Sequence, residues 1–420
     1  MQKCKLGKYI QVKHGYPFKS QFFSDNGKYI ILTPGNFYEE GGFKVTPGKE
    51  KFYTDEFPEE YLCNKNDLIV VMTEQVRGLL GSTALVPEDG KYLHNQRIGL
   101  ITYDENVISR DFLNYLFRTK TVRSQLEGSA SGTKIKHTSP DRICDVEVEL
   151  PSLEEQQRIG KLLKDIDDKI ATNNETISTL ESLSKTLYDY YFLQFDFPDE
   201  KGRPYKSSGG KMEYNAELGR EIPAGWKVGR ISDLGEVVSG GTPSTQNEDY
   251  FTSEGIAWIT PKDMSLLQGK WIFHGETDIT KEGLKNSSAK LMPAGSVVYT
   301  TRAPIGYVAV AANEVCTNQG FKSVSPNKDI GTEFVYYTLL SLGSHFKNIG
   351  NGSTFSEVSK ETFSNVPICL PPRDKLQSFA KVVNNLSQQQ KNAQSENRHL
   401  TALRDFLLPL LMNGQVGFKK

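Results

Sequence analysis

The chain has 420 residues, which is enough for two or three domains with hydrophobic cores of their own. Hydrophobic residues make up 37% of it and aromatic residues 10%, as in folded proteins, and the net charge of −1 does not by itself indicate a nucleic-acid partner. We expect no membrane partner, because no apolar run approaches the roughly 20 residues that cross a bilayer and the N-terminus does not resemble a secretory signal. Five cysteines without a CxxC pair predict reduced thiols in a cytoplasmic protein, with no metal site.

Short motifs occur twice in the same order along the chain. The pairs Leu-Gly, Thr-Pro, Asn-Gln and Leu-Pro begin at Leu6, Thr33, Asn95 and Leu150, and again at Leu234, Thr260, Asn318 and Leu370. This recurrence at a nearly constant offset predicts two similar but diverged halves, related as a pseudo-two-fold internal repeat.

The first half begins with a strand-rich domain. Short apolar runs at 29–33 and 68–72, bounded by Gly, Pro or Asn, predict buried strands. Helical spacing follows at 110–127, with Ser109 as the expected N-cap and Gly128 at the end.

The second half repeats this plan. Residues 297–299 parallel the strand at 68–72, and a helix is expected to begin with Thr332 as its cap and to end at Gly350.

A long helix with heptad spacing follows each domain. Apolar residues at seven-residue intervals, in two interleaved series, predict a coiled-coil seam. The seam residues are Ile159, Leu163, Ile166, Ile170, Ile177, Leu180 and Leu187 in the first helix, and Phe379, Leu386, Leu400, Leu403 and Leu407 in the second.

Both helices are polar near the middle, at Asn173-Asn174 in the first and at Gln389-Gln390 and Glu396-Asn397 in the second. Buried amides cost stability but fix register, so the matched polar centre suits two helices that cross in one defined alignment. Two alternatives remain open. Each helix could pack only on its own domain, or the helices could pair between chains.

These patterns predict an α+β fold with two similar α/β domains separated by two long antiparallel helices that form an intramolecular coiled coil. Residues 196–228 are rich in Gly, Pro and charge without a clear period, which is typical of a linker or return segment. The expected limits are 1–150 for the first domain, 151–195 for the central helix, 196–228 for the linker, 229–370 for the second domain and 371–420 for the distal helix and tail.

Known catalytic motifs are missing from the chain. It contains no GxGxxG after a strand, no GxxxxGK[ST], no HExxH, no GxSxG and no Asn/Asp-Pro-Pro-aromatic signature of an amino-methyltransferase. The sequence therefore favours a binding protein over an enzyme.

Polar loops at equivalent places in the two halves supply the candidate DNA contacts. Arg, Lys, Asn and Gln side chains can pair with base edges, and Ser or Thr beside Gly can approach phosphates. The candidates are Lys13, Lys19, Arg77, Asn95, Gln96, Arg97, Lys134 and Lys136 in the first half, and Ser244, Lys262, Arg302, Asn318, Gln319, Lys322, Ser353 and Thr354 in the second. Each loop could equally be an ordinary turn whose polar groups bond the local backbone.

One stretch of the first half is locally basic. Residues 118–142 contain six Lys or Arg and two acidic residues, which suggests a phosphate-binding rim. The alternative is a solvated helix face.

Four motifs carry a resemblance to a known family: LPSLEEQQRIGKLL at 150–163, IPAGWKVGRISDLG at 222–235, SGGTPS at 239–244 and the C-terminal LLPLLMNGQV. In this order they resemble the specificity subunit of Type I restriction–modification systems over nearly the whole chain. Two features depart from the family. The second helix entry, LPPRDKLQSFA, lacks the Glu-Gln pattern, and the first domain begins at KLGKYI without the Trp-containing lead-in found at Trp226.

The resemblance implies a non-catalytic subunit that reads double-stranded DNA. Each recognition domain would read one half of an asymmetric bipartite target, while the helices set the unread gap and dock two methyltransferase subunits, which restriction or motor subunits can join. S-adenosylmethionine, ATP and magnesium would belong to those partners, and none would be bound by this chain. The alternatives are a protein-binding scaffold and a solitary DNA-modifying enzyme with unrecognised motifs.

Overall fold

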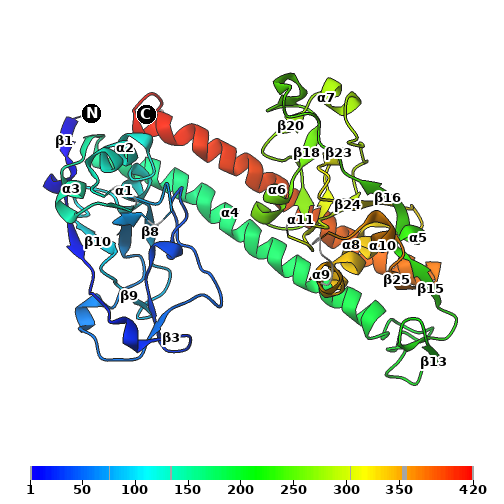
Figure 1. Ribbon diagram of the computed structural model, residues 1–420. Coiled ribbons are helices and arrows are strands. Elements are labelled where there is room, and N and C mark those ends of the chain that lie inside the picture. Colours follow the sequence, from blue (N-terminus) through cyan, green and yellow to red (C-terminus); the bar gives the residue numbers. More distant parts are fainter. Residues whose placement is uncertain (1, 75, 133–134, 303, 352–356, 419–420) are drawn as a thin grey trace. The chain divides into compact units, whose positions relative to one another are not determined.

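The computed structural model describes residues 2–74, 76–132, 135–302, 304–351 and 357–418 (Figure 1). The chain divides into two compact units. Unit 1 comprises Met1–Ile170 and His399–Lys420, and unit 2 comprises Ala171–Arg398. Each unit therefore contains one globular domain together with a part of each long helix.

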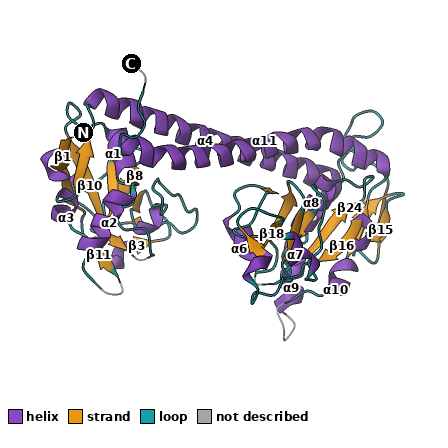
Figure 2. Ribbon diagram, turned by 90° about the horizontal axis from the view of Figure 1, so that it is seen from above, coloured by secondary structure: helices purple, strands orange, loops and turns teal. Residues whose placement is uncertain are grey.

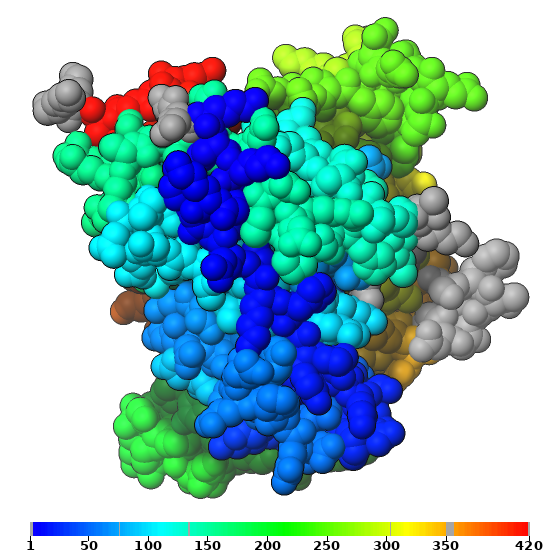
Figure 3. Space-filling model, turned by 90° about the vertical axis from the view of Figure 1, so that its left-hand side faces the viewer, coloured from blue at the N-terminus to red at the C-terminus, as the bar shows by residue number. Residues whose placement is uncertain are grey.

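Unit 1 is built on an antiparallel sheet with the strand order β2-β10-β6-β8. A smaller sheet has the order β3-β5-β4-β9, and β1 pairs with β12. The bounds are β1 Gln2–Lys5, β2 Ile10–His14, β3 Phe23–Ser24, β4 Tyr29–Ile31, β5 Phe52–Tyr53, β6 Leu68–Val71, β8 Thr83–Leu85, β9 Tyr92–Leu93, β10 Ile98–Tyr103 and β12 Glu147–Leu150. In Figure 3 the N-terminal residues, in blue, cross the visible face of this unit.

Three helices cover the sheet of unit 1: α1 (Arg110–Leu116), α2 (Lys120–Ser129) and α3 (Pro140–Cys144). The single helix expected over 110–127 is wrong, because the chain breaks between α1 and α2. Thr119 caps the second helix there, with its hydroxyl accepting a bond from the Val122 amide. The strands expected at 29–33 and 68–72 are confirmed as β4 and β6.

Unit 2 repeats this plan with one strand added. Its main sheet has the order β16-β24-β21-β22-β19, and β15 pairs with β25. The bounds are β15 Lys227–Arg230, β16 Gly235–Ser239, β18 Ala257–Ile259, β19 Trp271–Ile272, β21 Val297–Tyr299, β22 Val308–Ala311, β23 Val315–Thr317, β24 Lys322–Pro326, β25 Pro367–Leu370, α6 Pro261–Leu266, α8 Thr332–Ser341, α9 Gly343–Asn351 and α10 Lys360–Ser364.

Details of the two halves agree as well. The parallel pair β4–β9 corresponds to the parallel pair β18–β23. A Thr-Pro begins a helical turn after β4 and again after β18. The amide of Thr33 donates to the Asn36 side chain at 2.9 Å, and the amide of Thr260 donates to the Asp263 side chain at 2.7 Å. The internal repeat is therefore confirmed at the level of topology.

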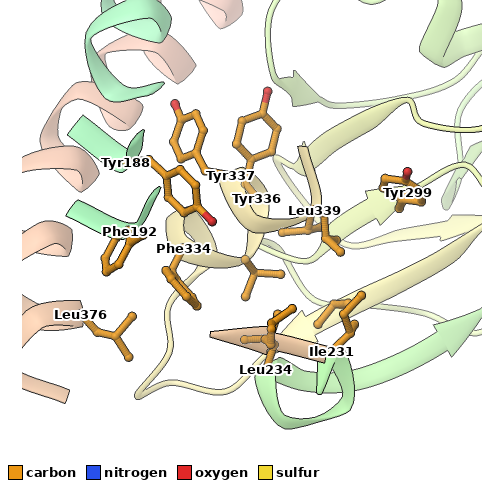
Figure 4. Packing of buried hydrophobic residues seen from close by; sticks show 14 of the residues in the cluster. Tyr188, Phe192, Ile231, Leu234, Tyr299, Phe334, Tyr336, Tyr337, Leu339 and Leu376 are labelled. Carbon is orange, nitrogen blue, oxygen red and sulfur yellow. The ribbon is translucent and has the colours of Figure 1, made fainter. Parts of the chain in front are cut away.

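The helix expected from Thr332 to Gly350 is also two helices, α8 and α9. Its cap is Gly331, and the Thr332 hydroxyl instead donates to the carbonyl of Gly295 at 2.9 Å. Tyr336 and Tyr337 of α8 lie in the main core of unit 2, beside Tyr188 and Phe192 (Figure 4).

The two long helices are α4 (Leu153–Tyr188), which continues as a π-helical turn over Asp189–Leu193, and α11 (Arg373–Met412), both purple in Figure 2. They meet inside each unit. In unit 1 Asp167 of α4 pairs with Arg404 of α11 at 2.9 Å, and in unit 2 the rings of Phe192 and Phe379 lie 5.0 Å apart. The alternative in which each helix packs only on its own domain is therefore wrong.

Most seam residues are buried or half-buried. Ile159, Leu163, Ile166, Ile177 and Phe379 are buried, and Ile170, Leu180, Leu187, Leu386, Leu400 and Leu407 are partly buried. Leu403 is a wrong assignment, because it is 45% exposed. The neighbouring Arg404 takes the inward position, where its guanidinium reaches Asp167. The heptad geometry of a coiled coil stays a prediction.

The segment 196–228, predicted to be a linker or return segment, contains regular structure. It contains the hairpin β13 (Met212–Asn215) and β14 (Arg220–Pro223). Phe197 stacks on Trp226 at 5.2 Å, and both are buried in the core of unit 2. Aromatic burial thus anchors a segment whose Gly and Pro content suggests freedom.

Candidate nucleic-acid interface

Loops from distant parts of unit 1 converge at one edge of its main sheet. β2 ends at His14 opposite Gly99, and β6 ends at Val71 opposite Ile98, so the loop before β10 lies between the two strand ends. The amide of Gln96 donates to the Tyr16 carbonyl at 3.1 Å, and that of Met72 donates to the Arg97 carbonyl at 2.9 Å.

A further loop joins the same edge through β7 (Thr73–Glu74) and β11 (Lys136–His137), which pair antiparallel. The Glu74 carboxylate accepts a bond from the Gly78 amide at 2.6 Å and so shapes the turn that carries Arg77. Arg77, Gln96 and Arg97 are exposed, and Lys136 is half-buried. The edge therefore presents cationic and amide donors that can pair with guanine or adenine edges or with phosphates.

Unit 2 builds the same edge from equivalent strands. Ser239, the last residue of β16, lies opposite Lys322, and Thr300 after β21 lies opposite Phe321. The Thr301 amide donates to the Gly320 carbonyl at 2.8 Å, and the Thr242 hydroxyl donates to the Gln319 side chain. Ser244 and Gln319 are exposed here, and Arg302 is half-buried.

Lys322 does not point freely to solvent. It is only 7% exposed, and its ammonium lies 3.3 Å from the Glu357 carboxylate, whose other oxygen lies 3.5 Å from Arg302. Sequence reasoning missed Glu357, because no local pattern shows which acidic residue a distant strand will bring to two cations.

Asn95 and Asn318 have the same local role in the two halves. Each side-chain oxygen accepts a bond from the amide two residues on, that of Arg97 at 3.3 Å and that of Gly320 at 2.9 Å. The alternative interpretation of these residues as turn formers is therefore supported at both positions.

A glycine after β2 and one after β16 allow the loops that carry Asn95 and Asn318 to approach closely. A β-carbon at Gly15 would lie 2.1 Å from the Asn95 carbonyl oxygen, and one at Gly240 would lie 1.9 Å from that of Asn318. Packing inside the protein accounts for both glycines without a phosphate.

Three predicted lysines lie apart from these contacts. Lys13 pairs with Glu60 at 2.7 Å and lies over the Tyr61 ring, Lys262 pairs with Glu276 at 2.5 Å, and Lys19 is exposed before a short turn. No described contact brings Lys19 to the sheet edge of unit 1 where the other loops converge. Lys134, Ser353 and Thr354 lie outside the described residues.

The basic stretch 118–142 is largely structural. Arg118 pairs with Asp167 at 2.9 Å, and Arg123 donates to the carbonyls of Phe117, Gly78, Leu80 and Glu39. Burial lowers the pKa of Arg123 to about 10. The phosphate-binding rim expected from local charge is therefore wrong for these two residues.

A buried histidine, His94, supports the loop of Asn95 and Arg97. Its Nε2 lies 2.8 Å from the Ile98 carbonyl oxygen, and burial lowers its pKa to about 4. Because Nε2 faces an acceptor and the ring is neutral, the proton is assigned to Nε2.

The described residues contain no group of three or more His, Cys, Asp or Glu side chains able to hold a metal ion. Among the helices of the described residues, none combines the length and the apolar character that a membrane crossing requires. The five cysteines are free, and burial raises the pKa of Cys63 and of Cys316 to about 12.

Comparison with known proteins gives a consistent result. The family model for the Type I restriction modification DNA specificity domain matches residues 1–182 and 223–400. A Type I restriction enzyme specificity subunit (MjaIX) from Methanocaldococcus jannaschii is 36% identical over 201 residues, which cover 47% of this chain and 46% of that protein. The HindI specificity subunit from Haemophilus influenzae is 25% identical over 399 residues, covering 82% of this chain and 86% of that protein.

Similarity in structure extends over nearly the whole chain. The crystal structure of the S subunit of a Type I restriction–modification system from M. genitalium superimposes with a TM-score of 0.64 at 15% identity, covering 98% of this chain and 96% of that one. At this identity the likeness shows the fold.

Proposed function

The chain belongs to the family with the Type I restriction modification DNA specificity domain, and from this premise we propose that each of its halves reads one part of a bipartite DNA target. The observation that carries the proposal is the repeated sheet edge, where distant loops gather exposed donors in both units. Gln96 and Gln319 recur at this edge, whereas Arg97 of the first half is replaced by Gly320 in the second, and Arg302 of the second half is half-buried beside Glu357. Different side chains read different bases, so the target is asymmetric.

The proposal assigns the gap between the two half-sites to α4 and α11. Their solvent-facing sides would also dock two methyltransferase subunits, which restriction or motor subunits can join in the cytoplasm. The role of this chain is recognition, so S-adenosylmethionine, ATP and magnesium would be bound by the partner subunits and not by this chain.

Methylome sequencing of a host that carries this gene with its methyltransferase partner tests the proposal. The expected result is one new adenine-methylation motif made of two specific parts and an unread gap. A continuous motif, or no motif with an active partner, would contradict it.

Purified chain alone tests the enzyme alternative. Incubated with mixed DNA, S-adenosylmethionine, magnesium and ATP, it should neither methylate nor cleave. A scaffold would instead show salt-insensitive binding to a protein and no binding to DNA, because phosphate contacts make DNA affinity fall with salt.

A further inference from the structure

A half-buried carboxylate joins both long helices to the domain of unit 1. Asp167 of α4 accepts bonds from the Tyr115 hydroxyl at 2.7 Å, from Arg118 at 2.9 Å and from Arg404 of α11 at 2.9 Å. Burial by itself raises the pKa of Asp167, but Arg118, the Tyr115 hydroxyl and Arg404 outweigh it and hold the pKa below its ordinary value. Asp167 is therefore an ionised partner of two guanidinium groups.

Unit 2 contains a corresponding carboxylate on the same helix. Glu181 of α4 accepts bonds from the Tyr337 hydroxyl and from Gln390 of α11, both at 3.1 Å. Lys270 lies 4.0 Å from Glu181, but its ammonium is already paired with Glu333 at 2.7 Å.

Amide groups of the two helices also bond one another in unit 2, at positions of α4 that fall between Asp167 and Glu181 in the sequence. Asn173 donates to Asn397 at 2.9 Å and to Glu396 at 2.8 Å, and Asn397 donates to Asn174 at 2.8 Å. These bonds confirm the matched polar centre at Asn173-Asn174 and Glu396-Asn397, of which Asn173 is buried. Gln389 is exposed and bonds Asn385 of its own helix.

The three layers are one heptad apart on both helices. Asp167 and Glu181 lie seven residues before and after Asn174, and Gln390 and Arg404 lie seven residues before and after Asn397. Seven residues are about two helical turns, so each set of three shares one helix face. In both outer layers α4 supplies the acid and α11 supplies a donor.

We propose that these layers form a pairing code that makes α11 the partner of α4 and excludes a second copy of α4. Suppose a second α4 took the place of α11, with its Asn174 where Asn397 lies. Its Glu181 would then occupy the place of Arg404 and face Asp167, and the same clash would recur at the other end.

The cations described around these carboxylates would not relieve this clash. Arg118 alone would have to neutralise both carboxylates in place of the two guanidinium groups that now serve Asp167. Glu181 cannot contribute its neighbour Lys270, which is committed to Glu333. Two carboxylates close together and partly buried strongly disfavour their charged forms.

The code acts on α4 and not on α11. Two copies of α11 in the same register would set Gln390 against Arg404, which brings no like charges together. The acids of α4 are therefore the groups that decide the pairing, independently of any DNA target.

Disulfide trapping in the full-length protein tests the code. The variant N174C alone should give no disulfide between two chains. The variant N174C/N397C should give a disulfide within one chain, which leaves the protein monomeric on a non-reducing gel. Adding E181R to N174C places an arginine opposite Asp167 of a second copy. The interchain disulfide should then rise at least tenfold over that of N174C.

Two matched variants separate the code from simple destabilisation. E181Q disrupts the native layer of unit 2 without supplying a cation, so it should give much less interchain disulfide than E181R. D167R added to E181R restores like charges and should abolish the gain. If E181R does not fold, D167N/E181Q with N174C replaces it, because loss of both charges should also raise the interchain disulfide.

Several outcomes would overturn the proposal. One is an interchain disulfide in N174C itself. Another is an increase in interchain disulfide with E181R that D167R does not remove. The third is no increase with either E181R or D167N/E181Q in the N174C background.

Discussion

At the residue scale, the two halves keep the same turn formers and change the side chains around them. Asn95 and Asn318 make the same bond to the backbone two residues on, and Gly15 and Gly240 make the same close approach. Between these fixed points, Arg97 is replaced by Gly320 and Gly99 is replaced by the buried Lys322. A common framework thus holds different donors, which is the requirement for reading two different half-sites.

Substitutions of Arg97 and Arg302 test whether each half reads its own half-site. Replacing Arg97 by Gln in the assembled complex should weaken DNA binding by roughly tenfold to a hundredfold, the cost of one lost two-pronged contact of about 1–3 kcal/mol. The loss should relax selectivity in one half-site, and R302Q should relax it in the other. Fluorescence anisotropy with targets altered in either half measures both effects.

K201Q is the control for these variants, because Lys201 is an exposed lysine whose amide bonds Asp199 within its own turn. A uniform loss in both half-sites with R97Q would contradict a base-reading role and indicate a phosphate contact.

His94 predicts a pH dependence in unit 1. An unfolded histidine titrates near 6.5, and burial lowers the pKa of His94 to about 4. As the pH falls from about 6.5 to about 4, the unfolded chain takes up the proton first, so the folded state loses stability over this window. Above pH 6.5 the group contributes no pH dependence.

The variant H94Q keeps a donor for the Ile98 carbonyl and removes the titration. Urea unfolding at several pH values should show the wild type losing stability relative to H94Q between pH 6.5 and 4. A constant difference between the two proteins across this range would show that His94 titrates normally in the folded state.

At the element scale, the two helix entries solve one problem differently. Gln156 at the start of α4 accepts from the Ser109 amide at 3.0 Å and donates to the Pro151 carbonyl at 3.0 Å. In α11 the corresponding turn carries Leu376, which is buried in the core of unit 2 (Figure 4). The missing Glu-Gln pattern of the second entry therefore reflects an apolar contact in place of a hydrogen-bonded one.

The polar layers also determine how the helices tolerate a change in length. Inserting four residues, about one turn, into both helices near Asn173 and Asn397 leaves each outer layer inside its own unit. The unread gap should lengthen while both half-sites stay the same. Methylome sequencing of the variant gives both results together.

The control is the same insertion in α4 alone, which shifts its two acids relative to their partners in α11 and should lower the thermal stability. A changed half-site with the double insertion would show that the helices are not the spacer.

At the scale of the whole molecule, both helices contribute residues to both units. Unit 1 includes the first part of α4 and the last part of α11, and unit 2 includes the remainder of each. Neither recognition domain is therefore independent of the helix that follows the other domain. Tyr115 and Tyr337, at equivalent places in α1 and α8, each bind a carboxylate of α4. One helix thus holds the equivalent tyrosines of two domains.

The sequence by itself determined the features that depend on local periodicity and order. These are the internal repeat, the two long helices with their polar centre and the strands at 29–31 and 68–71, because spacing along the chain decides which face of an element is apolar. Motif order was also sufficient for the family.

Only the tertiary structure decided which charged side chains are available to a partner. Arg118, Arg123 and Lys322 look like DNA contacts in the sequence, yet each is bound by groups from distant segments. Arg404 displaced Leu403 from the seam for the same reason, since Asp167 lies opposite it. The role of a charge depends on its neighbours in space, and long-range contacts place those neighbours where no local pattern records them.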